Sequence, residues 1–536
     1  MVVAQEAEAA KIGRDILRRG GNAVDAAVAV GFALAVTLPR AGNIGGGGFM
    51  VLHDAASGRD VAIDFRERAP AAATRDMFLD AHGNADPMLS RFSGLAVGVP
   101  GTVAGLAHAH ATYGSGTLSL KDLIAPAMAL ARDGIAVTRP LADSLASERI
   151  AARLGADPAA AAVFYPNGAP PAVGSTLVQS DLADTLQAIA ENGPAGFYEG
   201  PVAEAIAATV ASAGGMMTPQ DLANYTAVER APVTGTFKGY EIVSMPPPSS
   251  GGVHLIQMLN ILENGHFGTW GLNSADMIHH MAEAGKYAYA DRSHYLGDPD
   301  YVDIPVKALT SKDYAATLFG KIDPDSATDS SAIAPDPGAL PRESDETTHY
   351  SVLDENGNAV SVTYTLNFSY GVGIMAQGTG VLLNNELDDF SAKPGVPNAY
   401  GLIGGDANAV APDKRPLSSM TPTIVKKDGA VHIVTGSPGG SRIITTVMQI
   451  ILNATVHERD IMTATVAPRV HHQWLPDYIR IEEGISFDTI RLLEEKGHQV
   501  KVQRAMGSTQ SIKVEPDGLI TGASDTRTDG GLAAGD

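Results

Sequence analysis

The sequence predicts a layered α/β domain, in which strands pack face to face and helices cover them on the outside. Helical segments alternate with glycine-rich turns in the first part of the chain. The apolar spacing changes from helical to alternating after about residue 347, and two hairpin signals follow. No internal repeat is evident in the sequence.

Most of the expected helices lie in the first part of the chain. Gly20-Gly21 ends the first of them, and Asn22 is a suitable N-cap for the second. The apolar run 26–36 in that second helix is too short to cross a bilayer, and the adjoining Asp25 disfavours a signal-peptide core. We therefore expect a buried helix there. The predicted helices are 4–17, 23–37, 118–133, 179–192, 201–213, 253–264, 275–289 and 441–456.

The expected strands are short and lie beside tight turns. Asn356-Gly357 is a strong hairpin signal, and Asp428-Gly429 marks a second hairpin. The glycine loop 45–48 leads into the first strand, and it is not a phosphate loop because no Lys-Ser or Lys-Thr pair follows it. The predicted strands are 50–53, 61–66, 349–353, 359–365, 421–427 and 431–435.

Composition narrows the classes of function. The 536 residues carry 38 basic and 60 acidic side chains, and the resulting net charge of −22 disfavours nucleic-acid partners. With 44% hydrophobic and 18% charged residues, the chain has a globular composition. It has no cysteine, which removes disulfides, thiolate metal sites and thiol catalysis. No membrane-spanning segment is expected.

The segment 326–346, which is rich in Ser, Asp and Pro, is the best candidate boundary in the chain. It has few large apolar residues, so we expect a flexible linker. Thr347 follows it at the start of a predicted strand. If the bond between Glu346 and Thr347 were cut, Thr347 would carry a nucleophilic hydroxyl and, in its α-amine, a base with a pKa of about 8. The plain alternative is a threonine that only begins a strand.

Three other groups offer chemistry, each with a structural alternative. The N–H groups of Gly439 and Gly440 precede a predicted helix and suit a developing oxyanion, although the same residues could simply turn the chain. Asp388-Asp389 could bind an ammonium group, and Arg66 at a strand end could hold a carboxylate through two hydrogen bonds. Residues of these types are more often surface charges.

Metal sites are not expected. His279-His280 and His471-His472 are adjacent pairs, whose side chains point in different directions on a regular element. Neither pair has the His-x-x-x-His or His-Glu-x-x-His spacing of a metal site. No Gly-x-Ser-x-Gly elbow is present, so a serine hydrolase of that kind has no nucleophile here.

Several longer motifs resemble those of the γ-glutamyltranspeptidases, and they occur in the same order along the chain. The resemblance runs from about Gln5 to the region 507–511. It implies a four-layer αββα sandwich of the N-terminal-nucleophile hydrolase type, made as a precursor that cuts itself before a catalytic threonine. The matching stretches are 64–67, 246–252, 287–292, 347–352, 363–367, 382–391, 415–420 and 436–442.

The resemblance assigns Thr347, and not Thr348, as the catalytic threonine. Cleavage would leave a large subunit, 1–346, which ends in the linker 326–346, and a small subunit, 347–536. The two would form a heterodimer and one composite domain. The implied reaction transfers a γ-glutamyl group from glutathione or a related donor to water, an amino acid or a dipeptide. No cofactor or metal is implied, and neither nucleic acid nor a membrane is an expected partner.

The resemblance also assigns the other catalytic positions and a lid. Thr365 would orient Thr347, and Gly439 and Gly440 would donate their N–H groups to the oxyanion. Tyr400 lies in the stretch 394–405, which matches a lid loop of some bacterial members.

Two sets of side chains would grip the head group of the donor. Its α-carboxylate would be bound by Arg66, Ser418 and Ser419. Its α-ammonium would be bound by Asn367, Glu386 and Asp389. Position 386 is Glu where many bacterial relatives carry Gln, which implies a small shift in donor preference.

Two alternative activities and two possible locations remain beside this assignment. A cephalosporin (glutaryl) acylase would share the fold, and an unprocessed protein that only binds γ-glutamyl peptides would share the site. Bacterial family members are usually exported, so we expect a periplasmic or secreted protein whose signal peptide is absent from this chain. A cytoplasmic variant is the alternative.

Overall fold

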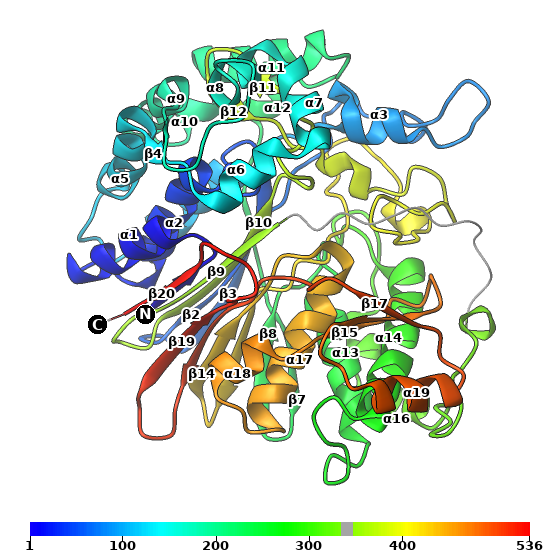
Figure 1. Cartoon of the computed structure of the whole chain (residues 1–536). Coiled ribbons are helices and arrows are strands. Elements are labelled where there is room, and N and C mark those ends of the chain that lie inside the picture. Colours follow the sequence, from blue (N-terminus) through cyan, green and yellow to red (C-terminus); the bar gives the residue numbers. More distant parts are fainter. Residues whose placement is uncertain (334–346, 536) are drawn as a thin grey trace.

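The protein is built around two stacked antiparallel sheets, as the computed structural model shows for residues 1–333 and 347–535 (Figure 1). The first sheet has seven strands in the order β20-β1-β9-β10-β2-β3-β6. The second has six strands in the order β19-β18-β14-β13-β8-β7. With helices on the outer face of each sheet, the predicted four-layer sandwich is confirmed.

The strand bounds follow the sheets. The first sheet consists of β1 (Val2–Ala4), β2 (Gly47–Asp54), β3 (Arg59–Phe65), β6 (Val228–Arg230), β9 (Thr348–Leu353), β10 (Ala359–Thr365) and β20 (Leu532–Ala534). The second consists of β7 (Val233–Phe237), β8 (Tyr240–Ser244), β13 (Thr423–Lys427), β14 (Ala430–Thr435), β18 (Gln510–Val514) and β19 (Ile520–Ser524). Smaller sheets pair β4 (Ile135–Ala136) with β5 (Thr176–Leu177), β11 (Met375–Ala376) with β12 (Val381–Leu382), and β16 (Ile479–Glu482) with both β15 (Val470–His471) and β17 (Val500–Gln503).

The helices form two outer layers. On the side of the first sheet lie α1 (Ala7–Arg18), α2 (Ala23–Thr37), α4 (Thr102–Tyr113), α5 (Leu120–Asp133), α9 (Ser180–Asn192), α11 (Gly200–Ser212) and the short α3 (Pro87–Phe92), α6 (Arg139–Ala146), α7 (Glu148–Ala156), α8 (Pro158–Phe164), α10 (Ala195–Tyr198) and α12 (Pro219–Ala223). On the side of the second sheet lie α13 (Gly251–Glu263), α14 (Ala275–Tyr295), α15 (Val306–Leu309), α16 (Lys312–Phe319), α17 (Ile443–Thr455), α18 (Ile461–Val466) and α19 (Phe487–Glu495).

Strand β2 contributes side chains to two hydrophobic cores, one on each face of the first sheet. Successive side chains of a strand point to opposite faces of the sheet. Met50 and Leu52 belong to the core beneath the first helical layer, whereas Phe49 and Val51 belong to the core that includes the space between the sheets. All four side chains are buried. The first sheet is therefore covered on both faces.

The buried helix predicted at 23–37 is α2, with the same bounds. Every residue of α2 is buried, and Asn22 and Asp25 form a capping box at its start. The apolar run is thus part of the core. Among the residues that the structure describes, no helix is long and apolar enough to cross a membrane.

The apolar pattern does not predict β1. The helix expected at 4–17 begins only at Ala7, because the Glu6 side chain caps it. The residues before this cap form a three-residue strand that pairs with β9 on one side and with β20 on the other. So short a strand has no recognisable period, and only its partners in the sheet define it.

Strands from both sides of Thr347 alternate in the first sheet (Figure 1). β1 precedes Thr347 in the sequence, yet it lies between β9 and β20, which follow it. β10, which follows Thr347, is paired with β2, which precedes it. A cut before Thr347 would therefore leave all of these strand pairs in place.

The predicted linker 326–346 requires a correction at its start. Ser330 is buried in the 3-10 turn η2 (Ser330–Ala332), and its N–H donates to Asp477 at 2.9 Å. The Trp474 Nε1–H group donates to the carbonyl of Ser330 at 2.9 Å. Distant polar groups thus anchor a stretch that has few apolar side chains of its own. Residues 334–346, the rest of this prediction, lie outside the described residues.

The two faces of β2 yield a stability test. Phe49→Ala should lower the free energy of unfolding by about 3–5 kcal/mol, because it leaves a cavity in the core that includes the space between the sheets. Phe487, which is 90% exposed, supplies the control, since Phe487→Ala should change stability by no more than about 0.5 kcal/mol. Chemical denaturation followed by tryptophan fluorescence measures both values. Equal losses in the two variants would contradict the layered core.

Candidate active site

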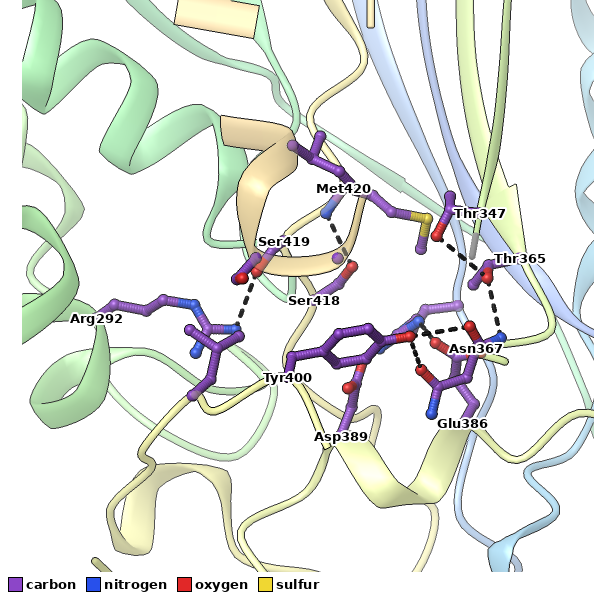
Figure 2. A pocket seen from close by; sticks show the side chains of 15 residues that line it. Arg292, Thr347, Thr365, Asn367, Glu386, Asp389, Tyr400, Ser418, Ser419 and Met420 are labelled. Atoms are coloured by element: carbon purple, nitrogen blue, oxygen red, sulfur yellow. Dashed lines mark hydrogen bonds and ion pairs between the residues drawn. The ribbon is translucent and has the colours of Figure 1, made fainter. Parts of the chain in front are cut away.

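Thr347 lies immediately before β9, where strand pairing brings it close to the end of β10. Its Oγ donates to the Oγ of Thr365 at 3.3 Å, and the backbone N–H of Asn367 donates to the same Thr365 oxygen at 2.9 Å (Figure 2). Thr347 and Thr365 are buried, at 6% and 3% exposure. The register that pairs Tyr364 with Thr348 fixes this contact. The hydroxyl of Thr347 is therefore held by the sheet itself.

The glycine turn after β14 faces the same space. Gly439 has a φ of 134° and Gly440 a φ of 56°, in the left-handed region that favours glycine. A Cβ on Gly440 would also lie 2.5 Å from the Tyr400 ring. The turn continues as the 3-10 turn η5 (Gly440–Arg442) into α17. Both the backbone conformation and the crowding therefore require glycine at position 440.

Arg66, at the end of β3, is fully buried and forms ion pairs with two carboxylates. One guanidinium nitrogen bonds Glu386, and the other lies 2.5 Å from Asp389. Both acids come from the 3-10 turn η3 (Glu386–Asp389). Burial by itself would lower the pKa of Arg66, but the charges of Glu386 and Asp389 outweigh it and raise that pKa. The guanidinium is therefore charged at any physiological pH.

Glu67 adds a third carboxyl to this group. It is fully buried beside Arg66, with 3.8 Å between the nearest charged atoms. Neither of its carboxyl oxygens has a hydrogen-bond partner among the described residues. Burial raises the pKa of Glu67 to about 7, although the charge of Arg66 opposes that rise. Glu67 is therefore partly protonated near neutral pH.

The opposite wall is formed by the loop that carries Ser418 and Ser419. Ser418 accepts a hydrogen bond from the N–H of Met420 at 3.1 Å, and its carbonyl accepts one from the N–H of Ser250 at 2.8 Å. Arg292 of α14 donates to the Ser419 hydroxyl at 3.3 Å (Figure 2). Burial lowers the pKa of Arg292 to about 10. The wall thus presents two hydroxyl groups and a second guanidinium.

Arg292 lines the cavity, but it is not among the site residues predicted from the sequence. It closes the stretch 287–292, which resembles the family, but no role was assigned to it from the resemblance. An arginine on a helix whose other residues are almost all buried is itself a signal, because a buried charge needs a partner. Its two hydroxyl partners, Ser250 at 2.9 Å and Ser419 at 3.3 Å, become visible only when distant segments are packed together.

Tyr400 closes the cavity between these walls. Its hydroxyl bonds both the carbonyl oxygen and the side-chain oxygen of Asn367, and the ring is 4% exposed. Ten of the eleven predicted site residues line this one cavity, and Gly439 adjoins it in the turn before Gly440. The free space between these side chains is about 20 Å³, which holds roughly one water molecule.

Comparison with known proteins identifies the family. The gamma-glutamyltranspeptidase family model matches residues 9–535. The glutathione hydrolase proenzyme of Escherichia coli (strain K12) is 57% identical over 539 residues, covering 100% of this chain and 91% of that protein. The chain belongs to the γ-glutamyltranspeptidase family.

Related acylases share the fold. The Acylase ACY 1 proenzyme of Pseudomonas sp. (strain V22) is 38% identical to this γ-glutamyltranspeptidase-family chain, covering 99% of it and 92% of the relative. The structure of cephalosporin acylase from Bacillus halodurans superimposes with a TM-score of 0.86 at 27% identity, covering 99% of this chain and 95% of that one. The Helicobacter pylori gamma-glutamyltranspeptidase structure matches with a TM-score of 0.59 at 48% identity, covering 61% of this chain and 93% of that one. The predicted N-terminal-nucleophile hydrolase fold is confirmed.

Glu67 makes the stability of this family member depend on pH. Its folded-state pKa of about 7 lies above the ordinary 4.5, so folding favours the protonated carboxyl. The resulting stabilisation is complete below the ordinary pKa and is lost as the pH rises through 7. Glu67→Gln should therefore gain in thermal midpoint relative to the natural protein as the pH rises from about 5 to about 8.

Thermal unfolding of both proteins across this pH range measures the difference. Glu355→Gln, at an exposed turn, is the control. If the difference in thermal midpoint between Glu67→Gln and the natural protein stays constant with pH, ionisation of Glu67 does not destabilise the folded state.

Proposed function

We propose that Thr347 is the nucleophile of a γ-glutamyltransferase that also acts as a glutathione hydrolase. The observation that carries this proposal is that Thr347 and the charged pair of Arg66 and Asp389 meet in one cavity. A γ-glutamyl donor has a reactive amide at one end and a zwitterionic head group at the other. The cavity offers a nucleophile for the first and both signs of charge for the second.

Cleavage before Thr347 is a condition of this chemistry. While its nitrogen takes part in a peptide bond, Thr347 has a hydroxyl but no basic amine. A cut after Glu346 supplies that amine and yields the large subunit 1–346 and the small subunit 347–536. The names of several relatives describe them as proenzymes, which supports such processing. The strands shared across the first sheet would hold the two subunits together as a heterodimer.

The reaction proceeds through an acyl-enzyme. The Oγ of Thr347 attacks the γ-carbonyl carbon of the donor, and its proton passes to the free α-amine. The N–H groups of Gly439 and Gly440 stabilise the oxyanion. As the carbon–nitrogen bond breaks, the α-amine returns the proton to the leaving amine. Water, an amino acid or a dipeptide then attacks the ester, which releases the γ-glutamyl product and restores the hydroxyl of Thr347.

The head group would be held by an exchange of ion pairs. Without donor, the guanidinium of Arg66 is paired with both Glu386 and Asp389. An incoming α-carboxylate takes the guanidinium, with hydroxyl groups from Ser418 and Ser419 beside it. The α-ammonium takes the freed carboxylates, next to the side chain of Asn367. Holding both ends fixes the scissile carbonyl near Thr347, and such orientation is worth several kcal/mol.

Tyr400 would act as the lid. A cavity of about 20 Å³ is too small for a glutamyl group, so the segment 394–405 must move before a donor enters. Its displacement breaks the bonds between Tyr400 and Asn367. That releases the Asn367 side chain to face the donor ammonium.

Two other activities fit parts of the site less well. A glutaryl donor, which acylases of this fold would use, has no α-ammonium and leaves Asp389 and Glu386 without a counter-charge. A protein that only binds γ-glutamyl compounds does not need a threonine hydroxyl aligned by Thr365. For location, we propose export to the periplasm or the medium, on the family resemblance, and fractionation of cells that express the precursor tests it.

Processing gives the first test of this proposal. The natural protein should separate on a denaturing gel into two fragments whose intact masses match 1–346 and 347–536. Thr347→Ala should remain a single chain and hydrolyse no γ-glutamyl anilide. Thr348→Ala is the matched control, because neighbouring side chains on a strand point to opposite faces. It should still be cut. An uncut natural protein, or turnover by Thr347→Ala, would remove Thr347 as the nucleophile.

Donor binding gives the second test. Asp389→Asn keeps the size of the side chain but removes its charge, so kcat/KM for a γ-glutamyl anilide should fall by about 100-fold or more, mainly through KM. The neighbouring Asp388 accepts hydrogen bonds from Ser90 at 2.5 Å and from Arg91 at 3.2 Å, outside the cavity. Asp388→Asn should therefore cause a smaller loss. Similar kinetics in the two variants would show that Asp389 does not bind the α-ammonium group of the donor.

A further inference from the structure

A second polar cluster joins the two future subunits away from the nucleophile. His279 and Glu283 lie one turn apart on α14, so their side chains share a face of the helix. His498, from the loop between α19 and β17, reaches them from a position 219 residues further along the chain. All three side chains are buried. The cluster is therefore enclosed, and it spans the boundary at residue 346.

The two imidazole rings face each other through their nitrogens. His279 Nδ1 lies 2.7 Å from His498 Nε2, and His279 Nε2 lies 2.8 Å from the carbonyl oxygen of Asp323. A carbonyl only accepts, so Nε2 of His279 carries the proton and Nδ1 carries a lone pair, which accepts the hydrogen bond from the Nε2–H group of His498. A neutral imidazole with a directed lone pair is the form that binds a metal.

The two carboxylate oxygens of Glu283 differ in their hydrogen bonding. One carboxylate oxygen accepts from Lys286 at 2.9 Å and from the N–H of Thr328 at 3.2 Å. The other oxygen is buried and has no hydrogen-bond partner among the described residues. A carboxylate oxygen left without a partner in the interior costs free energy. One ligand atom from each of Glu283, His279 and His498 lies within 4.8 Å of the other two.

We propose that His279, Glu283 and His498 bind a divalent cation of the zinc type. Two imidazole nitrogens and one carboxylate oxygen are a ligand set that zinc uses, with a fourth position left for water. Ligands about 2.0–2.2 Å from zinc stand roughly 3.4 Å apart. The two facing ring nitrogens therefore need to separate by less than about 1 Å, and the proton on His498 Nε2 must move to the Nδ1 of the same ring.

The charges around the cluster suit a cation. Glu283 and Asp477 are acids, and Lys286 is the base between them, at 2.9 and 3.6 Å. These three side chains carry one net negative charge, which offsets half of the charge of a dication. Lys286 bonds the other oxygen of Glu283 and also the carbonyl of Thr328, so it can keep these bonds while the metal binds.

The bound ion would act as a clip and not as a catalyst. It would fasten α14 to the loop that carries His498. The segment between Asp323 and Thr328 is bonded to the same side chains, and it leads toward the proposed cleavage point. This role rests on the proposed cleavage, whereas metal binding itself does not.

The neighbouring His280 explains why this site could not be predicted from the sequence. His280 bonds the carbonyl of Asp276 at 2.7 Å and packs on Trp270, with ring centroids 4.1 Å apart. The expectation that adjacent histidines do not share a metal therefore agrees with the geometry of His279 and His280. The second imidazole comes instead from a distant part of the chain.

Zinc binding to the purified full-length protein tests the proposal. After dialysis against a chelator, titration with Zn²⁺ in competition with a chromophoric chelator should show one ion per protein. His498→Ala and Glu283→Gln should weaken this binding at least about tenfold, whereas His280→Ala should retain it. Co²⁺ added in place of Zn²⁺ should give the visible absorption of a tetrahedral site, and only in the proteins that keep all three ligands.

Hydrolysis of a γ-glutamyl anilide by each variant reports that it is folded, and its failure in every protein would count against the proposed function and not against the metal site. The proposal is overturned if the natural protein binds Zn²⁺ no more tightly than His498→Ala or Glu283→Gln. It is also overturned if His280→Ala loses the ion to the same degree, since the binding would then not depend on the three named ligands.

Discussion

The pairing of β9 with β1 and β10 is the constraint on which the rest of the structure depends. It holds Thr347 at the rim of the first sheet, and it places Thr365 within reach of the hydroxyl. Because β1 comes from the N-terminal end of the chain, the same pairing also binds together the segments on either side of residue 346. A single peptide bond can thus be cut while the nucleophile keeps its position.

The charged residues in the wall of the cavity are explained better by ligand binding than by stability. A fully buried guanidinium with carboxylates around it is costly to desolvate, and ion pairs of this kind add little to stability. Arg66, Glu386 and Asp389 are therefore better understood as a receptor for a zwitterion, since an incoming carboxylate and ammonium can replace each internal partner. Glu67, buried without a hydrogen-bond partner among the described residues, raises the cost of this arrangement further.

Much of the site was accessible from the sequence because its residues lie in long local motifs. The stretches around Thr347, Asp389 and Gly439 resemble family motifs one by one, and the structure brings them together. Arg292 and His498 were not accessible in this way. Each acquires its partner only through packing between elements far apart in the sequence, and no local spacing records such a contact.

The fold class, the buried helix α2, the two hairpins and the candidate site residues could all be predicted from the sequence. These features depend on apolar period, turn residues and local motifs, all of which are properties of short segments. Packing between distant segments was needed to reveal the strand β1, the anchoring of residues 326–333, the position of Tyr400 over the cavity and the contact between His279 and His498. Each of these depends on backbone or side-chain groups whose hydrogen-bonding requirements are met by residues distant in the chain.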